Sequence, residues 1–276
     1  MPTPDVTIVV TTFDRAAWLE ASLHSILASA AVARQARITT RVLVVDDASP
    51  NDETHYVAER LGVDYVRVPV NDGRRTPSFG RVVGLEQVDS TYHAFFDDDD
   101  IMLPRWIPLH VAALEAGHDI CSTAFWRTDA SLLPVRQVVP AVATLGDLMA
   151  GRNPINDQSL VRREALEGIE WEPELDNVMV LPVWLELSLR GRSFHRLEEP
   201  TFLHRRHDEN TSDHLDPRDA DLRRQVIARY RPRVIERYGA VPEPSLRPPS
   251  RPAPIPPQRR PLWRRAASKV RRKLGR

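Results

Sequence analysis

The stretch YHAFFDDDDIMLP, residues 92–104, joins an apolar run rich in aromatic side chains directly to four consecutive aspartates. Residues 92–96 are typical of a buried β-strand, so the aspartates at 97–100 are expected at its carboxyl end. Four adjacent carboxylates repel one another, and a hard divalent cation that prefers oxygen ligands, Mg²⁺ or Mn²⁺, would relieve that repulsion. The alternative is a solvated acidic turn, because blocks of like charge are usually exposed. The apolar lead-in favours the metal site, since ligands of open α/β sheets bind beyond the carboxyl ends of the strands.

Three earlier apolar runs also indicate buried strands, and each is followed by polar residues. The runs cover residues 6–10, 41–45 and 65–70, and the polar residues after them are 11–14, 46–47 and 71–73. Stretches with helical spacing of apolar residues separate the runs, with Asp14 as the expected cap of the first helix. Strands that alternate with helices predict an α/β fold with a mostly parallel sheet flanked by helices. The polar residues then meet at one edge of the sheet, where a nucleotide would bind.

The sequence lacks the two common glycine-rich phosphate loops. There is no G-x-G-x-x-G after the first predicted strand and no G-x-x-x-x-G-K-[ST] anywhere in the chain. Phosphate would therefore have to be held through a metal and arginine side chains. The same absence argues against a nucleotidyltransferase, which has a similar sheet and paired metal-binding aspartates but needs a basic, glycine-rich loop after its first strand.

Five stretches, taken in order, resemble the family 2 glycosyltransferases of the GT-A fold. They are VTIVVTTFDR at 6–15, VLVVDDASPND at 42–52, NDGRRTPSFGRVVGL at 71–85, YHAFFDDDDIMLP at 92–104 and FLHRRHDENTS at 202–212. The resemblance implies a Rossmann-like, mostly parallel sheet flanked by helices, with acceptor-side elements toward the C-terminus, between about residues 105 and 200. It also implies an enzyme that uses a divalent cation to move a sugar from a nucleoside-diphosphate sugar to an acceptor.

The resemblance assigns the donor to a small set of side chains. The base and ribose would be held by Thr11, Phe13 and Asp46. Arg81 matches the arginine of the family's Ala-Arg-Asn stretch, although Gly80 and Val82 replace its neighbours, and it would contact the diphosphate as a charged donor.

The metal site is implied in the same way. The family's D-x-D motif corresponds to Asp97, Asp98 and Asp99, so Asp97 and Asp98 would contact the donor while Asp97 and Asp99 bind the cation. Asp100 is instead expected to cap the next helix. His207 matches the histidine of the C-terminal segment, which would lie near the diphosphate and metal, and the alternative for it is a surface histidine in a polar loop.

An inverting transfer needs a base within hydrogen-bond reach of the acceptor hydroxyl. The family supplies an acidic pair at the start of a late helix, and that helix matches residues 182–191 here, but Met179 and Val180 stand where the pair should be. Asp176 is the nearest carboxylate upstream and is the predicted base, with Glu186 and Asp157 as other candidates. If no carboxylate serves, the protein would be a nucleotide-sugar-binding protein that has lost catalysis.

Composition indicates a cytoplasmic location. The chain has 276 residues and a single cysteine, Cys121, which excludes an intrachain disulfide framework and suits a reducing compartment. No apolar run approaches the ~18 residues that span a bilayer, and the N-terminus does not resemble a secretory signal. The acceptor is not identified by any residue, and the resemblance favours a cell-envelope or lipid-linked glycan.

The end of the chain differs from the rest. From Ser245 onward there are 11 basic and no acidic side chains, which leaves 27 basic against 38 acidic before it. We predict a glycosyltransferase domain over residues 1–238, a proline-rich linker over 239–261 and a basic amphipathic tail over 262–276 that suits an anionic membrane surface at the inner face of the membrane. The alternative is a disordered basic tail that touches nucleic acid. Nucleic acid is not an expected partner of the whole protein, because the acidic body would oppose phosphate backbones.

Overall fold

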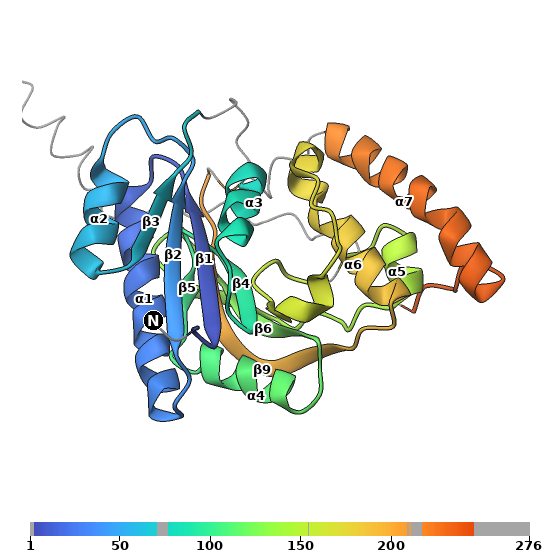
Figure 1. Ribbon diagram of the computed structural model, residues 1–276, viewed down its shortest axis with the longest axis horizontal. Coiled ribbons are helices and arrows are strands. Elements are labelled where there is room, and N and C mark those ends of the chain that lie inside the picture. The colour runs from blue at the N-terminus through green and yellow to red at the C-terminus, as the bar shows by residue number, and fades with distance from the viewer. Residues whose placement is uncertain (1–2, 71–76, 154, 209, 211–216, 246–276) are drawn as a thin grey trace, which may run out of the picture. The chain divides into compact units, whose positions relative to one another are not determined.

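The N-terminal half of the chain forms a parallel sheet with the strand order β3-β2-β1-β4 (Figure 1). The computed structural model describes residues 3–70, 77–153, 155–208, 210 and 217–245. The strands of this half are β1 (Val6–Thr12), β2 (Thr40–Asp46), β3 (Asp64–Arg67) and β4 (Tyr92–Asp97), and the helices between them are α1 (Ala16–Gln35), α2 (Glu53–Leu61) and α3 (Ser78–Glu86). The predicted alternation of strands and helices is therefore confirmed.

One local prediction in this half is wrong. Asp14 does not cap α1, because Arg15 occupies the N-cap position and no side chain caps the helix. Asp14 instead has a φ of 53°, a left-handed conformation in the turn between β1 and α1. Its amide donates to the Ser49 hydroxyl at 2.9 Å. The residue thus joins the loops that follow β1 and β2.

Alternate residues of the central strands face opposite layers, as the two-residue period of a strand requires. On β1, Val6, Ile8 and Val10 belong to the core that includes α1 and α4 (Trp106–Glu115), while Val9 packs with β2 residues and Val83 of α3 on the other face. Figure 1 shows α1 and α3 on opposite faces of the sheet. Burial on both faces explains why these strands are continuous apolar runs.

The C-terminal half extends the same sheet. Within the described residues the sheet has nine strands. Eight follow the order β3-β2-β1-β4-β8-β6-β9-β5, and the ninth, β7, pairs with β6. The added strands are β5 (Ile101–Met102), β6 (Ile120–Thr128), β7 (Pro134–Val138), β8 (Leu160–Arg162) and β9 (Phe194–Arg205). β8 is antiparallel to both β4 and β6, whereas β9 runs parallel to β6. Before residue 156, the acceptor-side stretch contains β7 and the helix α5 (Leu145–Met149).

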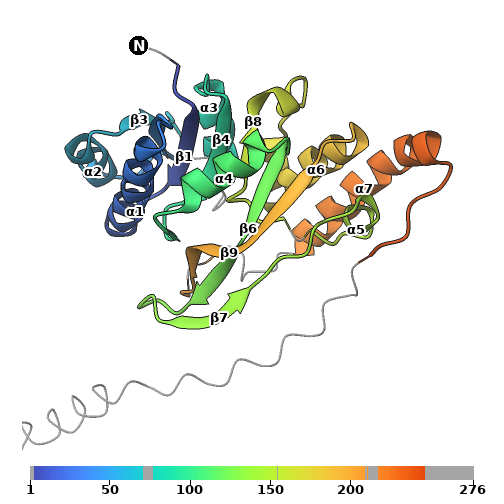
Figure 2. The same cartoon turned by 90° about the horizontal axis from the view of Figure 1, so that it is seen from below.

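A second core lies under the helices of this half (Figure 2). It packs α5, α6 (Val180–Leu189) and α7 (Pro217–Tyr238), with two 3₁₀ segments at Arg163–Leu166 and Pro173–Val178. The described start of the predicted linker contacts this layer, because the Ser245 hydroxyl donates to Asp147 at 2.7 Å. The rest of the linker and the predicted tail, residues 246–276, lie outside the described residues.

Helix α1 is long and apolar enough to cross a membrane by length and composition alone. Its 20 residues have a mean hydropathy of 1.3 over the relevant window, so the expectation that no segment reaches this length is corrected. In the fold, however, Leu19, Leu23 and Ile26 are fully buried in the core. Core helices pass the same test, and α1 packs as one.

Candidate donor and metal site

The four aspartates follow β4 directly and lie between it and β5, at the carboxyl edge of the parallel strands. Carboxylate oxygens of Asp97, Asp99 and Asp100 lie within 4.8 Å of one another. Asp98, Asp99 and Asp100 are buried, with 0–7% of their surface exposed. The run is therefore not the solvated turn considered as an alternative, and Asp100 is not a helix cap, since α4 begins at Trp106.

Burial of this cluster has a clear electrostatic consequence. Burial raises the pKa of Asp97 and of Asp98 to about 7, and the neighbouring aspartates add to the rise at both. Arg81 opposes the rise at Asp97, and Arg15 opposes it at Asp98. Burial likewise raises the pKa of Asp100. Buried carboxylates that repel one another favour a bound proton or a bound cation, and a set of oxygen ligands fits Mg²⁺ or Mn²⁺.

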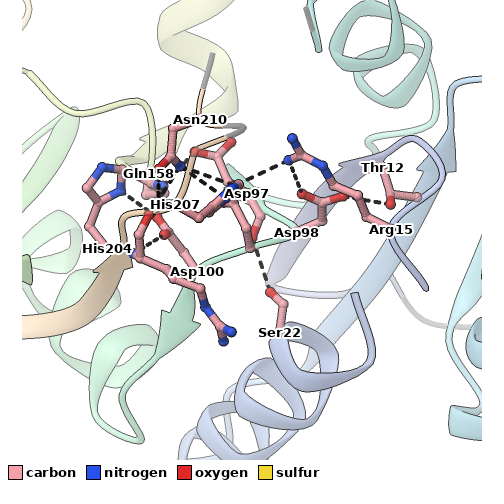
Figure 3. A network of polar contacts seen from close by, with 12 residues as sticks. Thr12, Arg15, Ser22, Asp97, Asp98, Asp100, Gln158, His204, His207 and Asn210 are labelled. Atoms are coloured by element: carbon pink, nitrogen blue, oxygen red, sulfur yellow. Dashed lines mark hydrogen bonds and ion pairs between the residues drawn. The ribbon is translucent and has the colours of Figure 1, made fainter. Parts of the chain in front are cut away.

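Asp98 connects the aspartate run at 97–100, called the metal loop below, to the turn after β1 (Figure 3). The Thr12 hydroxyl donates to it at 2.7 Å, and the Arg15 guanidinium lies 3.5 Å from it and 3.3 Å from Asp99. The Ser22 hydroxyl donates to the Asp97 carbonyl at 3.2 Å. β1 and the start of α1 thus hold the backbone and side chains of the cluster in place.

Asp100 is held from the opposite side. Its oxygens accept hydrogen bonds from Gln158 at 2.7 Å and from the Arg205 amide at 2.9 Å, and the His204 ring nitrogen Nδ1 lies 3.2 Å away. Gln158 also donates to Asp97 at 2.8 Å. One amide therefore bridges two carboxylates of the cluster, and the end of β9 is fixed against the metal loop (Figure 3).

The structure brings His207 into the cluster. Its Nε2 lies 2.9 Å from Asp99, and its ring packs edge-on against Trp18 with 4.1 Å between the centroids. Asn210 orients the histidine, since its side-chain oxygen accepts from the His207 amide at 2.6 Å. His207 is 7% exposed, so it is not the surface histidine considered as an alternative.

Arg81 reaches the cluster from α3. Its guanidinium donates to Asp97 at 3.1 Å and to Asp157 at 2.8 Å, and it lies over the Phe95 ring at 5.2 Å. Although burial alone would lower it, the pKa of Arg81 is raised by Asp157 and Asp97. The arginine is therefore permanently charged beside the carboxylates.

The residues expected to hold the nucleoside lie at the same edge, in different environments. Thr11 is buried at the end of β1, and Phe13 is exposed just after it. Asp46 is fully buried, and its two oxygens accept hydrogen bonds from Ser49, Thr54 and Tyr65. Burial opposes its charge, but these hydrogen bonds together lower the pKa of Asp46. Residues 71–76, including the predicted polar loop at 71–73, lie outside the described residues.

The predicted base lies one turn before α6. Asp176 is 7% exposed, its φ of 50° and ψ of −126° depart from helical values, and its carboxylate lies 3.2 Å from Arg218. Its carbonyl accepts from the Ser78 hydroxyl at 2.9 Å, which joins it to α3. Met179 and Val180 are buried in the apolar core of α6.

Six residues that contact the aspartates were not predicted: Thr12, Arg15, Ser22, Gln158, His204 and Asn210. Four of them, Thr12, Arg15, His204 and Asn210, fall inside stretches that carry the resemblance. His204 stands two residues after the core residue Phe202, which places both on one face of β9. No pattern in the sequence marks Gln158, because its place depends on how β8 pairs with β4.

Comparisons with known proteins bear on the family and on the fold. The model of the family described as "Glycosyl transferase family 2" matches residues 7–165. Among solved structures, S. aureus TarS shares 17% identity with this chain over 84% of its length, with a TM-score of 0.57. The structure of TarS residues 1–349 in complex with UDP-GlcNAc is 16% identical, with a TM-score of 0.61. That match covers 84% of this chain and 73% of the other. Mannosyltransferase PcManGT from Pyrobaculum calidifontis, in complex with GDP-Man and Mn²⁺, shares 16% identity over 87% of this chain and 66% of its own, with a TM-score of 0.56.

These similarities differ in what they establish. At such identities the solved structures show the fold, and the chain spans 43% of the length of TarS. No curated protein sequence matches the chain significantly. The family match covers more than half of the chain and includes the four aspartates at 97–100, although β9 and His207 lie beyond it. The chain belongs to glycosyl transferase family 2.

Proposed function

We propose that the protein is a metal-dependent glycosyltransferase that moves a sugar from a nucleoside-diphosphate sugar to an acceptor hydroxyl with inversion. The observation that carries this proposal is the cluster of Asp97, Asp99 and Asp100 at the carboxyl edge of the parallel strands, with His207 and Arg81 against it. The titles of similar structures name UDP-GlcNAc, GDP-Man and Mn²⁺ as bound molecules of those proteins. We extend that ligand class, though no particular sugar, to this chain.

The residues of the cluster have distinct proposed roles. Asp97 and Asp99 would hold Mg²⁺ or Mn²⁺ with His207 as a further ligand, since carboxylate oxygen and imidazole nitrogen suit such ions. The bound cation would act as a Lewis acid on the leaving diphosphate. Asp98, braced by Thr12 and Arg15, would position the loop that meets the donor.

The donor would lie along the loops after β1 and β2 and beside Arg81 of α3. Phe13 is exposed and can stack on a base, and Thr11 ends the adjoining strand. Asp46, whose oxygens are already filled by protein donors, would hold the loop after β2 and receive the ribose only through rearrangement of those bonds. Arg81 would stabilise charge on the diphosphate, because it is buried, charged and fixed at both ends.

We assign Asp176 as the base that accepts the proton of the acceptor hydroxyl. Residues with positive φ that are not glycine are uncommon and cluster at functional sites, and Asp176 is one of them. Its contact with Ser78 of α3 fixes it against the helix that also carries Arg81. Its carboxylate also forms an ion pair with Arg218 at 3.2 Å.

A second function has one specific observation in its favour. The two positions that carry the family's acidic pair hold Met179 and Val180, which are 1% and 5% exposed and packed among apolar residues. A protein without any base at this place would bind a nucleotide sugar without transferring it. The rate of donor hydrolysis by the wild type and by Asp176→Asn separates this binding protein from the enzyme.

The acceptor and the location are proposed from the resemblance and from the composition of the chain. A cell-envelope or lipid-linked glycan would be met at the inner face of the membrane, where the basic residues 262–276 would contact anionic lipid after the proline-rich segment that begins near residue 239. The single buried cysteine suits the cytoplasm. Nucleic acid is not proposed as a partner.

The metal site is tested by Asp99→Asn, which replaces the carboxylate by an uncharged amide of equal size. Loss of a group that merely supports a metal ligand typically costs 10- to 100-fold in metal affinity, so we expect nucleotide binding in the presence of Mn²⁺ to weaken by at least about 10-fold. Isothermal titration of UDP and of GDP, each with and without Mn²⁺, measures this. Asp89→Asn, an exposed aspartate before β4, is the matched control and should bind like the wild type. Equal Mn²⁺-dependent affinity in both variants would refute the assignment.

A further inference from the structure

Three basic side chains form a row across neighbouring strands beside the metal cluster. Arg127 of β6 lies directly opposite Arg136 of β7, and on its other side directly opposite His204 of β9. Residues directly opposite in paired strands project from the same face of the sheet. The three side chains therefore share one face, with Arg127 in the middle.

The row is connected to the metal loop at one end only. His204 contacts Asp100 at 3.2 Å, while β7 is paired only to β6 among the described strands and is exposed along most of its length (Figure 2). The nucleoside-binding loops follow β1 and β2, which lie on the other side of β4 in the strand order. The row thus extends from the cluster away from the donor and toward the acceptor side of the sheet.

The two arginines of the row have no acidic partner. Within the described part of the chain, no carboxylate lies within 4.0 Å of the guanidinium of Arg127 or Arg136, and the buried Nε of Arg127 has no hydrogen-bond partner. Burial and the neighbouring Arg136 both lower the pKa of Arg127. Like charges directly opposite on paired strands destabilise a sheet, so the pairing of these two arginines does not stabilise the contact between β6 and β7.

Arg206 adds a third guanidinium to the two. Its amide donates to the Thr128 carbonyl at 3.2 Å, which fixes it beside the end of β6. Burial lowers the pKa of Arg206, and Arg127 and Arg136 lower it further. The three arginines are therefore close enough to act on one another, and they concentrate positive charge at the end of β6.

We propose that Arg127 and Arg136, with Arg206 beside them, bind the phosphate group of a phosphorylated acceptor. This inference rests on the proposed transferase function, and it narrows the acceptor to molecules that carry a phosphate ester near the hydroxyl that receives the sugar. A phosphate accepts several charge-assisted hydrogen bonds from guanidinium groups at once. Bound there, it would relieve the repulsion between the opposed arginines and hold the acceptor on the far side of the metal cluster from the nucleoside.

The site is tested by binding alone, with neither metal nor nucleotide present, so that a failure of the donor site does not affect the result. Glycerol 3-phosphate, a soluble phosphate monoester, is titrated into the full-length protein at low salt. Loss of one charge-assisted hydrogen-bonding group weakens an interaction by about 10- to 100-fold, and we expect this loss in Arg127→Gln and in Arg136→Gln. Arg105→Gln, an exposed arginine paired with Glu199, is the control and should keep wild-type affinity.

A second binding experiment tests whether the phosphate group belongs to a soluble molecule or to a lipid. Vesicles that contain phosphatidic acid present the same phosphate monoester on a lipid, and their binding is compared between the wild type and the same three variants. Phosphatidylglycerol vesicles of equal charge are the reference for binding through the basic residues 262–276. Weaker binding of glycerol 3-phosphate by the Arg127 and Arg136 variants supports a soluble acceptor, whereas a loss confined to the vesicles supports a lipid-linked one. Wild-type affinity of both variants in both arms, or no binding by the wild type in either arm, overturns the proposal. If Arg127→Gln fails to fold, Arg136→Gln on the exposed strand β7 carries the test.

Discussion

At the scale of single residues, catalysis depends on which carboxylate stands near α6. Restoring the family's acidic pair as Val180→Asp would place a carboxylate at a position that is 5% exposed and surrounded by the apolar core of α6. A buried charge without a partner is strongly destabilising, so position 180 suits an apolar side chain that packs in the core and does not suit a catalytic carboxylate. Of the other candidates, Glu186 is paired with Arg190 and Arg233, and Asp157 is paired with Arg81. Asp176 remains the proposed base, and its unusual backbone conformation is maintained although it costs on the order of 1–3 kcal/mol.

We therefore expect Asp176→Asn to slow sugar transfer and leave donor binding nearly unchanged. General-base assistance contributes about 10² to 10⁴ in rate, and the amide cannot accept the proton. Donor hydrolysis uses water as the acceptor, so the rate of nucleotide release in the presence of Mn²⁺ measures the step without a known acceptor. Nucleotide affinity is measured in parallel, because a fall in turnover alone identifies loss of a group that acts in the transition state.

Arg218→Gln is the matched variant for this test. It removes the ion pair with Asp176 but keeps the carboxylate, so it should retain most of the activity. If Asp176→Asn hydrolyses the donor as fast as the wild type, Asp176 is not the base. If the wild type binds the donor tightly with Mn²⁺ and shows neither hydrolysis nor transfer, the protein is a nucleotide-sugar-binding protein.

At the scale of elements, the approach of α3 to the sheet decides where Arg81 lies. Gly80 and Gly84 stand one turn apart on the face of α3 that meets β1 and β2. A Cβ at Gly84 would lie 2.4 Å from a Val9 methyl group, and one at Gly80 would lie 3.1 Å from a Thr11 methyl group. The two glycines thus permit close packing, and Arg81 on the same helix reaches Asp97 as a result.

Gly84→Ala should destabilise the fold despite the better helix propensity of alanine. The propensity gain is about 1 kcal/mol, whereas overpacking a buried contact costs about 1–3 kcal/mol. We expect a net loss in the free energy of unfolding of up to about 2 kcal/mol, measured by denaturant titration. Gly80→Ala meets a looser contact and should be milder. A Gly84 variant more stable than the wild type would show that α3 can move outward freely.

Sequence patterns were sufficient for most of the parallel half of the fold because both faces of β1, β2 and β4 are buried. Continuous apolar runs located β1, β2 and β4, and the resemblance placed Asp97, Asp99 and His207 in regions that the structure brings together. The exposed strand β7 has no such run, with Leu133 and Val135 mostly exposed, so nothing distinguished it from a loop. The bonds of Gln158 and Arg15 to the cluster depend on strand pairing and on a turn with positive φ, which local patterns do not encode.

At the scale of the whole molecule, buried ionisable groups make stability depend on pH in two opposing ways. Asp97 and Asp98 have pKa values raised to about 7, so in the metal-free protein they stabilise the fold at low pH, and this contribution is lost as pH rises from about 4 to about 7. Burial lowers the pKa of His93 to about 4 and that of His110 to about 3. The lowered pKa values of these histidines have the opposite effect, because their contribution to the free energy of unfolding is lost as the pH falls.

His93 allows the histidine contribution to be isolated. Burial and the nearby Arg163 lower its pKa from the ordinary 6.5 to about 4. Below pH 6.5 the unfolded chain therefore binds a proton that the folded protein does not accept until about pH 4, so stability falls as the pH drops through this interval. Each unit of pKa shift corresponds to about 1.4 kcal/mol, which gives a limit of roughly 3 kcal/mol for His93.

His93→Phe keeps an aromatic ring of similar size and removes the titrating group, whose Nδ1 has no hydrogen-bond partner. We expect the free energy of unfolding of this variant, relative to the wild type, to improve steadily between pH 6.5 and pH 4, because the carboxylate and His110 contributions are common to both and cancel in the difference. Denaturant titrations at several pH values without metal measure it. His24→Gln, at an exposed histidine, should follow the wild-type curve. A difference between His93→Phe and the wild type that stays constant over this range would mean that His93 gains its proton equally in the folded and unfolded states.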